Sequence, residues 1–172
     1  MDELDVKRAL TRLSYEIVEK SAELDNVILV GIKTRGIPLA KILAANIEKN
    51  SGIAVPILEL DITFYRDDLS VPMDMPTVRE PHFDRDINGK ELIIVDDVLY
   101  TGRTIRAAID AIFSQGRPAN IRLAVLIDRG HRELPIRPDY IGKNVPTSQK
   151  EFIRVNLDET DGKTNVELYD KE

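Results

Sequence analysis

Hydrophobic positions near the start of the chain recur with the period of a helix. Val6, Leu10, Leu13 and Ile17 step by four, three and four residues. Their side chains therefore share one face of a helix that we expect to run from about residue 5 to residue 23. The pattern predicts an amphipathic helix that buries this stripe against a core.

Beyond this helix, short apolar runs alternate with amphipathic stretches. We predict strands at residues 27–31, 54–64, 91–95 and 121–127, and helices at residues 38–51 and 105–116. Two further apolar runs, at 152–157 and 166–169, flank an Asp161-Gly162 turn and are expected to pair in antiparallel fashion. Apolar strands that alternate with amphipathic helices indicate an α/β fold with a central, mainly parallel sheet flanked by helices.

The domain organisation follows from chain length and from one long interruption of the pattern. A chain of 172 residues can bury one complete core, so we expect a single domain spanning residues 1–172. Periodicity disappears between residues 65 and 83, where Pro72, Pro76 and Pro81 accumulate. Because loops of this length are usually functional or mobile, this segment is a candidate functional loop.

The composition excludes several classes of protein. Hydrophobic residues make up 42% and charged residues 31%, as in folded globular proteins. The absence of cysteine excludes disulfides and thiolate chemistry and fits a cytoplasmic protein. No apolar run approaches the roughly 20 residues of a membrane span, so we expect no membrane association. The net charge of −6 is not typical of nucleic-acid-binding proteins, although residues 117–143 carry six basic and three acidic residues.

Carboxylates and a hydroxyl-rich turn follow the third predicted strand. Asp96 and Asp97 come directly after an apolar run, and the sequence TGRT at residues 101–104 then enters a helix. Ligands of open parallel sheets bind beyond the carboxyl ends of the strands. Main-chain N–H groups at a helix N-terminus, threonine hydroxyls and a glycine suit a phosphomonoester, whereas carboxylates suit sugar hydroxyls near a divalent cation. The segment therefore predicts a site for a phosphorylated ribose.

A simpler interpretation of the same segment stays open. Asp96 and Asp97 would then be an acidic strand end, and Thr101 or Thr104 would cap the following helix. The segment lacks the Gly-Lys-Ser/Thr ending of a nucleotide P-loop and the Gly-x-Gly-x-x-Gly of a dinucleotide-binding fold. The ordered combination is nevertheless more specific than any of its parts, and it favours phosphoribose over both nucleotide motifs.

Residues 92–104, LIIVDDVLYTGRT, resemble the motif with which type I phosphoribosyltransferases bind 5-phosphoribosyl-1-diphosphate (PRPP). Further blocks are similar to the family members that are both pyrimidine-operon regulators and uracil phosphoribosyltransferases: RALTR at 8–12, LVGIKTRG at 29–36, DITFYRDDLS at 61–70 and DRGHRELPIRPDYIGKNVPTS at 128–148. The resemblance spans nearly the whole chain. It implies the type I phosphoribosyltransferase fold, with a flexible flap at about residues 65–83 and a small hood at about residues 128–158 plus the C-terminal strands.

The resemblance also implies the roles of individual residues. It implies three catalytic residues: Asp96, Asp97 and Arg66. Asp96 and Asp97 would bind the ribose hydroxyls, and Arg66 belongs to the flap. The PRPP motif comprises Leu92, Ile93, Ile94, Val95, Asp96, Asp97, Val98, Leu99, Tyr100, Thr101, Gly102, Arg103 and Thr104. The diphosphate loop comprises Lys33, Thr34, Arg35 and Gly36, unless this is a simple surface turn. Mg²⁺ would arrive with PRPP or diphosphate rather than at a metal site of the protein, and main-chain groups near residues 140–145 or 150–153 would read the uracil ring.

The resemblance further implies a regulatory partner. The protein would bind the leader of pyrimidine-operon mRNA, promoted by UMP or UTP, and would form a homodimer or a higher homo-oligomer. The implied RNA-binding residues are Arg8, Thr11, Arg12, His131, Arg132, Arg137 and Lys143. Each of them would otherwise be a solvated surface residue, or a capping or core residue in the case of His131. Tyr15 replaces a histidine of some family members and would either stack on a base or merely cover the helix.

Tyr100 is where the motif departs from the purine-using members, which usually carry an acid before Thr-Gly. A neutral phenol is a poor proton acceptor, so the departure favours a pyrimidine substrate and shifts catalysis toward positioning and electrostatics. We therefore assign no general base.

Two alternatives stay open: an RNA-binding regulator that keeps the pocket only as a nucleotide sensor, and a purine phosphoribosyltransferase without RNA binding.

Overall fold

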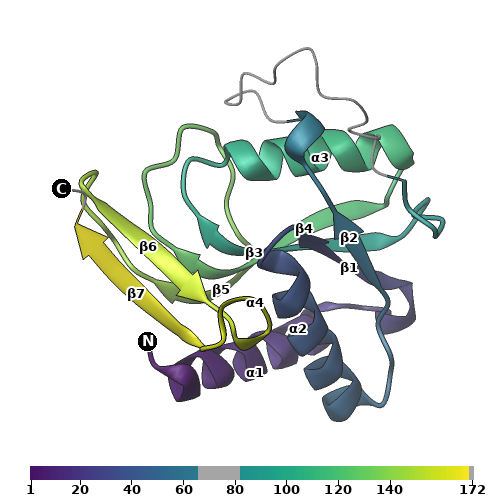
Figure 1. Ribbon diagram of the computed structural model, residues 1–172. Coiled ribbons are helices and arrows are strands. Elements are labelled where there is room, and N and C mark those ends of the chain that lie inside the picture. Colours follow the sequence, from purple (N-terminus) through teal and green to yellow (C-terminus); the bar gives the residue numbers. More distant parts are fainter. Residues whose placement is uncertain (66–81, 171–172) are drawn as a thin grey trace.

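A computed structural model describes residues 1–65 and 82–170 of the chain (Figure 1). The strands are β1 Val27–Ile32, β2 Ile57–Leu60, β3 Glu91–Leu99, β4 Asn120–Asp128, β5 Tyr140–Asn144, β6 Glu151–Asn156 and β7 Asn165–Asp170. The helices are α1 Glu3–Lys20, α2 Gly36–Ser51, α3 Arg103–Gln115 and α4 Asp158–Asp161, with 3-10 turns η1 Leu24–Asn26 and η2 Thr63–Tyr65. None of the described helices has the length and apolar character needed to cross a membrane.

A parallel sheet forms the centre of the molecule (Figure 1). Within the described residues its strands lie in the order β2-β1-β3-β4-β5, and every neighbouring pair is parallel. Strands β6 and β7 form a separate antiparallel pair. The predicted parallel sheet and the predicted C-terminal antiparallel pair are thus confirmed.

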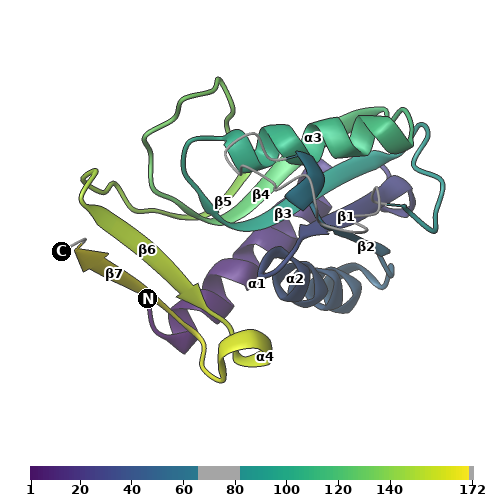
Figure 2. The same ribbon diagram turned by 45° about the horizontal axis from the view of Figure 1, so that its top comes forward.

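Helices cover both faces of the sheet (Figures 1 and 2). Successive residues of β3 alternate between two cores: Ile93 packs in the cluster that contains residues of α1 and α2, and Ile94 packs in the cluster that contains residues of α3. Both side chains are fully buried, which contributes roughly 1.5–3 kcal/mol of transfer free energy each. Burial on both faces explains why this strand reads as a continuous apolar run.

Helix α1 carries the predicted stripe, since Val6, Leu10, Leu13 and Ile17 are all buried. The helix begins earlier than predicted because the carboxylate of Asp2 accepts a hydrogen bond of 2.8 Å from the main-chain N–H of Asp5, and the Asp5 carboxylate completes a capping box. It ends at Lys20 rather than near residue 23. The prediction was therefore right about the buried face and wrong at both ends.

Three differences in the strands bear on the site. The predicted strand at 54–64 is reduced to β2, because the carboxylate of Asp61 accepts hydrogen bonds from Thr63 and turns the chain into η2. Strand β3 continues to Leu99, so the acidic pair lies within the strand and not after it. Strand β5 was not predicted, although it buries Tyr140 completely.

The C-terminal hairpin packs beside the start of α1 (Figure 1). The N-terminal amine of Met1 donates a hydrogen bond of 2.9 Å to the main-chain oxygen of Val166, and the N–H of Val166 donates to the oxygen of Met1. Between β6 and β7 the chain forms α4 and then a left-handed turn at Gly162. The hairpin and α4 correspond in sequence to the C-terminal part of the predicted hood.

Candidate active site

The carboxyl ends of β1, β2 and β3 meet at a polar cavity of about 360 Å³. The sheet register explains the meeting, because Ile32 pairs with Leu60 on β2 and Gly31 pairs with Val95 on β3. The cavity is lined by Ile32, Lys33, Thr34, Arg35, Asp61, Ile62, Thr63, Asp96, Asp97, Val98 and Thr104. The structure therefore brings the predicted acidic pair and the predicted diphosphate loop to one site.

Asp96 and Asp97 form a coupled pair of carboxyl groups. Asp96 is only 8% exposed, and its Oδ1 accepts the main-chain N–H of Asp97 at 2.9 Å. Burial raises the pKa of Asp96 well above its ordinary value, and the negative charge of Asp97 adds to the effect. Burial also raises the pKa of Asp97, although the Arg35 cation partly opposes this. Groups that stabilise carboxylate charge, such as ribose hydroxyls or a cation, would be favoured here.

The turn at residues 101–104 lines a second, adjoining cavity of about 240 Å³. Gly102 is the N-cap residue of α3 and has a φ of +96°, a conformation that favours glycine. As a glycine, this N-cap residue has no side chain with which to cap the helix. One residue earlier, the Thr101 hydroxyl accepts a hydrogen bond of 3.3 Å from the N–H of Arg103, the first residue of α3, so Thr101 takes part of the predicted capping role. The following N–H groups of the first turn of α3 would be available to a phosphate.

The turn between β1 and α2 is held against β3. A Cβ atom on Gly36 would lie 2.3 Å from the main-chain oxygen of Val95. Glycine is therefore required here for contact between two protein backbones. Lys33 in the same turn forms an ion pair of 3.1 Å with Asp61 at the end of β2.

Tyr100 connects the motif to the hood. Its ring lies beneath the guanidinium of Arg129, with 4.0 Å between the Arg129 Cζ and the ring centre. Arg129 is 6% exposed and donates hydrogen bonds to Thr147 Oγ1, to the main-chain oxygen of Ser148 and to that of Glu151. Tyr100 is thus part of a buried contact to the turn that precedes β6.

The main chain of β5 has fewer available groups than expected for a base-reading segment. The oxygens of Ile141 and Gly142 accept hydrogen bonds from Arg12 at 3.0 and 2.6 Å. The other edge of β5 pairs with β4. Of the two segments predicted to read uracil, residues 140–145 are therefore largely occupied. The start of β6 is engaged as well, because the oxygen of Glu151 accepts a hydrogen bond from Arg129 and residues 151–153 pair with β7.

Sequence reasoning missed three residues of this region, and one predicted residue cannot be placed. Asp61 follows the carboxyl end of β2, but the predicted strand at 54–64 ran past it, so the strand-end rule did not select it. Arg129, over the ring of Tyr100, and Asp161, in an ion pair with Arg35, reach the site only because the fold brings distant segments together. Arg66 and nearly all of the predicted flap at 65–83 lie outside the described residues.

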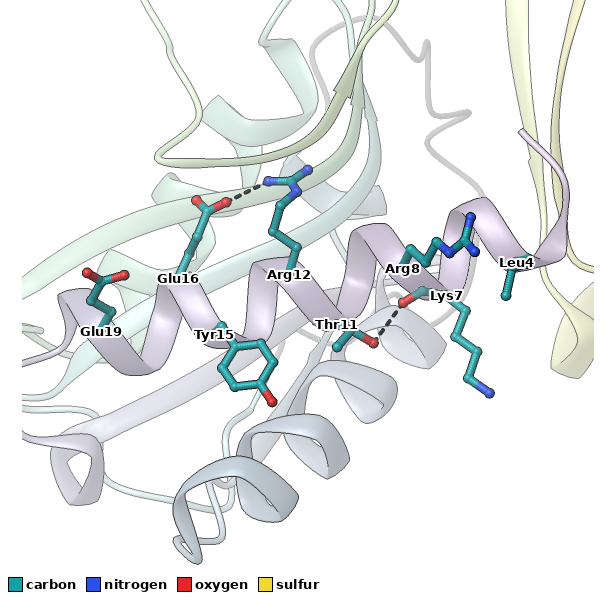
Figure 3. A pocket seen from close by; sticks show the side chains of 8 residues that line it. All are labelled: Leu4, Lys7, Arg8, Thr11, Arg12, Tyr15, Glu16 and Glu19. Atoms are coloured by element: carbon teal, nitrogen blue, oxygen red, sulfur yellow. Dashed lines mark hydrogen bonds and ion pairs between the residues drawn. The ribbon is translucent and has the colours of Figure 1, made fainter.

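A second surface lies on α1, on the sheet face opposite α3. A groove of about 590 Å³ is lined by Leu4, Lys7, Arg8, Thr11, Arg12, Tyr15, Glu16 and Glu19. Figure 3 shows Lys7, Thr11 and Tyr15 projecting from the same side of the helix, with Arg12 paired to Glu16. Arg8 and Arg12 also line a hollow with Lys143 of β5. Four of the predicted RNA-binding residues, Arg8, Thr11, Arg12 and Lys143, are thus gathered here.

The other predicted RNA-binding residues lie apart from α1, in the segment between β4 and β5. The main-chain N–H groups of Glu133 and Leu134 donate to the oxygen of Thr101, which places this segment beside the motif. Arg132 is engaged within the protein: it donates to Asp128 at 2.6 Å and to the main-chain oxygens of Tyr100 and Ile136. His131 and Arg137 are exposed. The seven predicted residues therefore form two groups rather than one surface.

Comparisons with known proteins agree with this architecture. Residues 2–160 match the phosphoribosyl transferase domain family. The chain is 58% identical over 170 residues to a protein of Clostridium perfringens named bifunctional protein PyrR, covering 99% of this chain and 96% of the relative. It is 56% identical over 174 residues to the protein of the same name from Caldicellulosiruptor bescii, covering 100% and 96%. The crystal structure of a hypoxanthine phosphoribosyltransferase from Staphylococcus aureus superimposes with a TM-score of 0.69 at 20% identity, covering 88% of this chain and 77% of that one. The chain therefore belongs to the phosphoribosyltransferase family and, within it, to the bifunctional PyrR proteins.

Proposed function

We propose that this protein converts uracil and PRPP to UMP and diphosphate, and that it binds pyrimidine-operon leader RNA in response to uridine nucleotides. The observation that carries the enzymatic half is the buried Asp96 and Asp97 pair, which lies between the phosphate turn at 101–104 and the loop at 33–36. The names of the relatives in Clostridium and Caldicellulosiruptor support the combination of two functions.

The two adjoining cavities match the parts of PRPP. The N-terminus of α3 and the Thr101 and Thr104 hydroxyls would hold the 5-phosphate, because oriented N–H groups and the helix dipole favour an anion. Asp96 and Asp97 would accept hydrogen bonds from the ribose hydroxyls. The diphosphate would lie toward Lys33 and Arg35 on the far side of the acidic pair.

The acidic pair also fits a divalent cation that arrives with the substrate. Carboxylate oxygens are the ligands that Mg²⁺ prefers, and Mg²⁺ usually keeps substrate phosphates and water as its other ligands. Within residues 1–65 and 82–170, no three acidic or histidine side chains converge on one point, so Asp96 and Asp97 would supply a minority of the ligands. When bound, the ion would neutralise charge on the departing diphosphate.

Catalysis then rests on positioning and electrostatics. The bond from the ribose C1 to the diphosphate oxygen breaks and a bond to uracil N1 forms, while the N1 proton is released. Tyr100 occupies the position at which purine-using members carry an acid, and its ring is covered by Arg129. Neither group is a good proton acceptor at neutral pH. The protein would instead accelerate the reaction by alignment and by stabilising charge at the diphosphate.

The RNA-binding half is assigned first to the surface of α1. Arg8, Arg12 and Lys143 provide positive charge, and Tyr15, which is 56% exposed, offers a ring on which an unpaired base can stack. Arg132 is assigned a structural role in the loop before β5 instead of a phosphate contact, because its guanidinium already donates hydrogen bonds to Asp128 and to the main-chain oxygen of Tyr100.

We further propose that the protein is cytoplasmic and forms a homodimer or a higher homo-oligomer. Light scattering after size-exclusion chromatography would measure the oligomeric state.

Two assays separate this proposal from its alternatives. In a base-competition assay with labelled uracil, excess hypoxanthine and guanine should leave UMP formation unchanged; inhibition with formation of purine nucleotides would instead indicate a purine phosphoribosyltransferase. In a filter-binding titration with leader RNA, affinity should rise when UMP is added. RNA binding without any uracil conversion would identify a regulator that uses the pocket only as a sensor.

A further inference from the structure

The guanidinium of Arg35 joins the candidate active site to helix α4. Its Nη2 lies 2.8 Å from Oδ1 of Asp161, in an ion pair whose side chains are 29% and 14% exposed. The other oxygen of the same carboxylate, Oδ2, accepts the main-chain N–H of Leu157 at 2.9 Å. Asp161 is therefore fixed by the backbone at the start of α4, and it presents its second oxygen to Arg35 in a defined position.

A second atom of Arg35 has no partner. Its Nε is buried and makes no hydrogen bond among the described residues. Buried donors without an acceptor are rare in folded proteins and call for a specific explanation, such as a missing ligand. Arg35 lines the cavity of about 360 Å³ together with Thr34 and Asp97. The Arg35 side chain as a whole is 29% exposed, so a small shift of the guanidinium would let an acceptor that enters this cavity supply the missing partner.

We infer that Asp161 is a positioning residue for the diphosphate group of PRPP: it anchors one end of the Arg35 guanidinium so that Nε can donate to a diphosphate oxygen. The inference rests on the proposed function and adds α4 to it. A charged, planar guanidinium held at one edge by a carboxylate is pre-organised for an anion at the other, which lowers the ordering cost of binding. The hydrogen bond from the Leu157 N–H and the Arg35 guanidinium hold the pKa of Asp161 below its ordinary value, so the anchor is ionised at neutral pH.

Helix α4 offers a matched control for this anchor. Glu159 also forms an ion pair with the β1–α2 region, since its Oε1 lies 2.7 Å from Nζ of Lys41. These two side chains are 57% and 49% exposed, and neither lines the cavity. Exposed pairs of this kind contribute little. Glu159→Gln therefore removes the same charge from the same helix without touching Arg35.

The test compares Asp161→Asn with Glu159→Gln by steady-state kinetics and by calorimetric titration with diphosphate and Mg²⁺. Asp161→Asn should raise the KM for PRPP and the Kd for diphosphate by about tenfold, as expected for the loss of one charge-assisted contact. The KM for uracil should change by less than about twofold, and Glu159→Gln should match the wild type. Asp161→Glu, which keeps the charge, should restore part of the affinity. In an Arg35→Ala background, Asp161→Asn should have no further effect.

The outcomes separate this inference from the proposed function. A wild-type protein that forms UMP, with diphosphate affinity unchanged by Asp161→Asn, would overturn the inference alone. A wild-type protein that forms no UMP but binds diphosphate more tightly than Asp161→Asn would overturn the proposed function and support the anchor. A thermal melt of each variant shows whether α4 stays folded. If Asp161→Asn lowers Tm more than Glu159→Gln does, the diphosphate affinity of Asp161→Glu, compared with the wild type, decides instead. In addition, Arg35→Ala must bind diphosphate with the same affinity whether or not it also carries Asp161→Glu.

Discussion

The guanidinium carbon of Arg129 lies 4.0 Å from the centre of the Tyr100 ring, directly over the motif residue that distinguishes this chain from purine-using relatives. Arg129 is buried, and its N–H groups are taken up by oxygens of the turn at residues 147–151. A cation over an aromatic face is stabilised by roughly 1–2 kcal/mol when it is shielded from water. The motif and the turn at residues 147–151, which leads into one of the two segments predicted to read uracil, are therefore linked through the Arg129 side chain.

Replacing Tyr100 tests this link. Tyr100→Phe keeps the aromatic face, so the KM for uracil should stay within about twofold of the wild type. Tyr100→Leu removes the face but keeps an apolar group, and we expect it to cost roughly 1–2 kcal/mol of stability and to raise the KM for uracil several-fold. Steady-state kinetics and urea unfolding measure both effects. Equal effects of the two variants would show that the ring face has no role.

An acid at position 100 tests the assignment of base preference. Tyr100→Asp would place a carboxylate beneath the Arg129 guanidinium, where the ion pair keeps it charged. We expect this variant to change the preference for uracil over hypoxanthine, or the pH dependence of kcat/KM. Kinetics identical to the wild type across pH 6 to about 9, a range that covers ordinary catalytic pKa values, would contradict the interpretation of Tyr100.

The buried acidic pair predicts a pH-dependent stability difference. Burial holds the pKa of Asp96 above its unfolded value, so ionisation opposes folding. This penalty is absent below the unfolded pKa, grows as pH rises toward the folded pKa and is constant above it. Asp96→Asn cannot ionise, and its stability relative to the wild type should therefore increase from acidic to neutral pH. Urea unfolding without ligand measures the difference; a gap that shrinks as pH rises would contradict the burial of this carboxyl.

The contact of Gly36 with β3 predicts a combined loss of stability and binding. Gly36→Ala would place a Cβ atom 2.3 Å from the oxygen of Val95, so the loop must shift, at a cost of about 1–3 kcal/mol. The KM for PRPP should rise because Arg35 moves with the loop. Gly52→Ala is the control: its Cβ would meet open space at a φ of +77°, so it should lose about 1 kcal/mol without affecting PRPP. Equal KM values for the two variants would argue against a role of this loop in PRPP binding.

Charge removal on α1 should separate RNA binding from catalysis. Arg8→Ala and Lys143→Ala should each weaken leader RNA binding and lower the slope of log K against log salt by about 1, with uracil conversion unchanged. Arg12→Ala is a poorer probe because Arg12 also holds β5 through Ile141 and Gly142. Arg85→Ala is the charge-matched control. Arg85 is exposed, and nearby Phe83 packs in the core cluster on the α3 side of the sheet, the face opposite α1. An equal loss of RNA affinity in the control would remove the assignment to α1.

Features that depend on local sequence patterns could be predicted, whereas contacts between residues far apart in the chain could not. The apolar period of α1 and the apolar run at 92–95 predicted a parallel sheet with helices on both faces, and the order of residues 96–104 placed the acidic pair and the TGRT turn beside one site. The Arg35–Asp161 and Tyr100–Arg129 contacts join residues far apart in the chain, and no local spacing marks them. Strand β5 was missed because only Tyr140 is buried among its residues, so it shows no alternating pattern.

The most direct test of the proposed activity is conversion of labelled uracil to UMP in the presence of PRPP and Mg²⁺, with the wild type and the double variant Asp96→Asn/Asp97→Asn compared at pH 7.5, near neutral. The wild type should form UMP, and the variant should lose at least about a hundredfold in kcat/KM, because two oriented charges at the ribose are removed. The variant should remain folded by thermal melt. A wild type that forms no UMP, or a folded variant that forms it at the wild-type rate, would contradict the account.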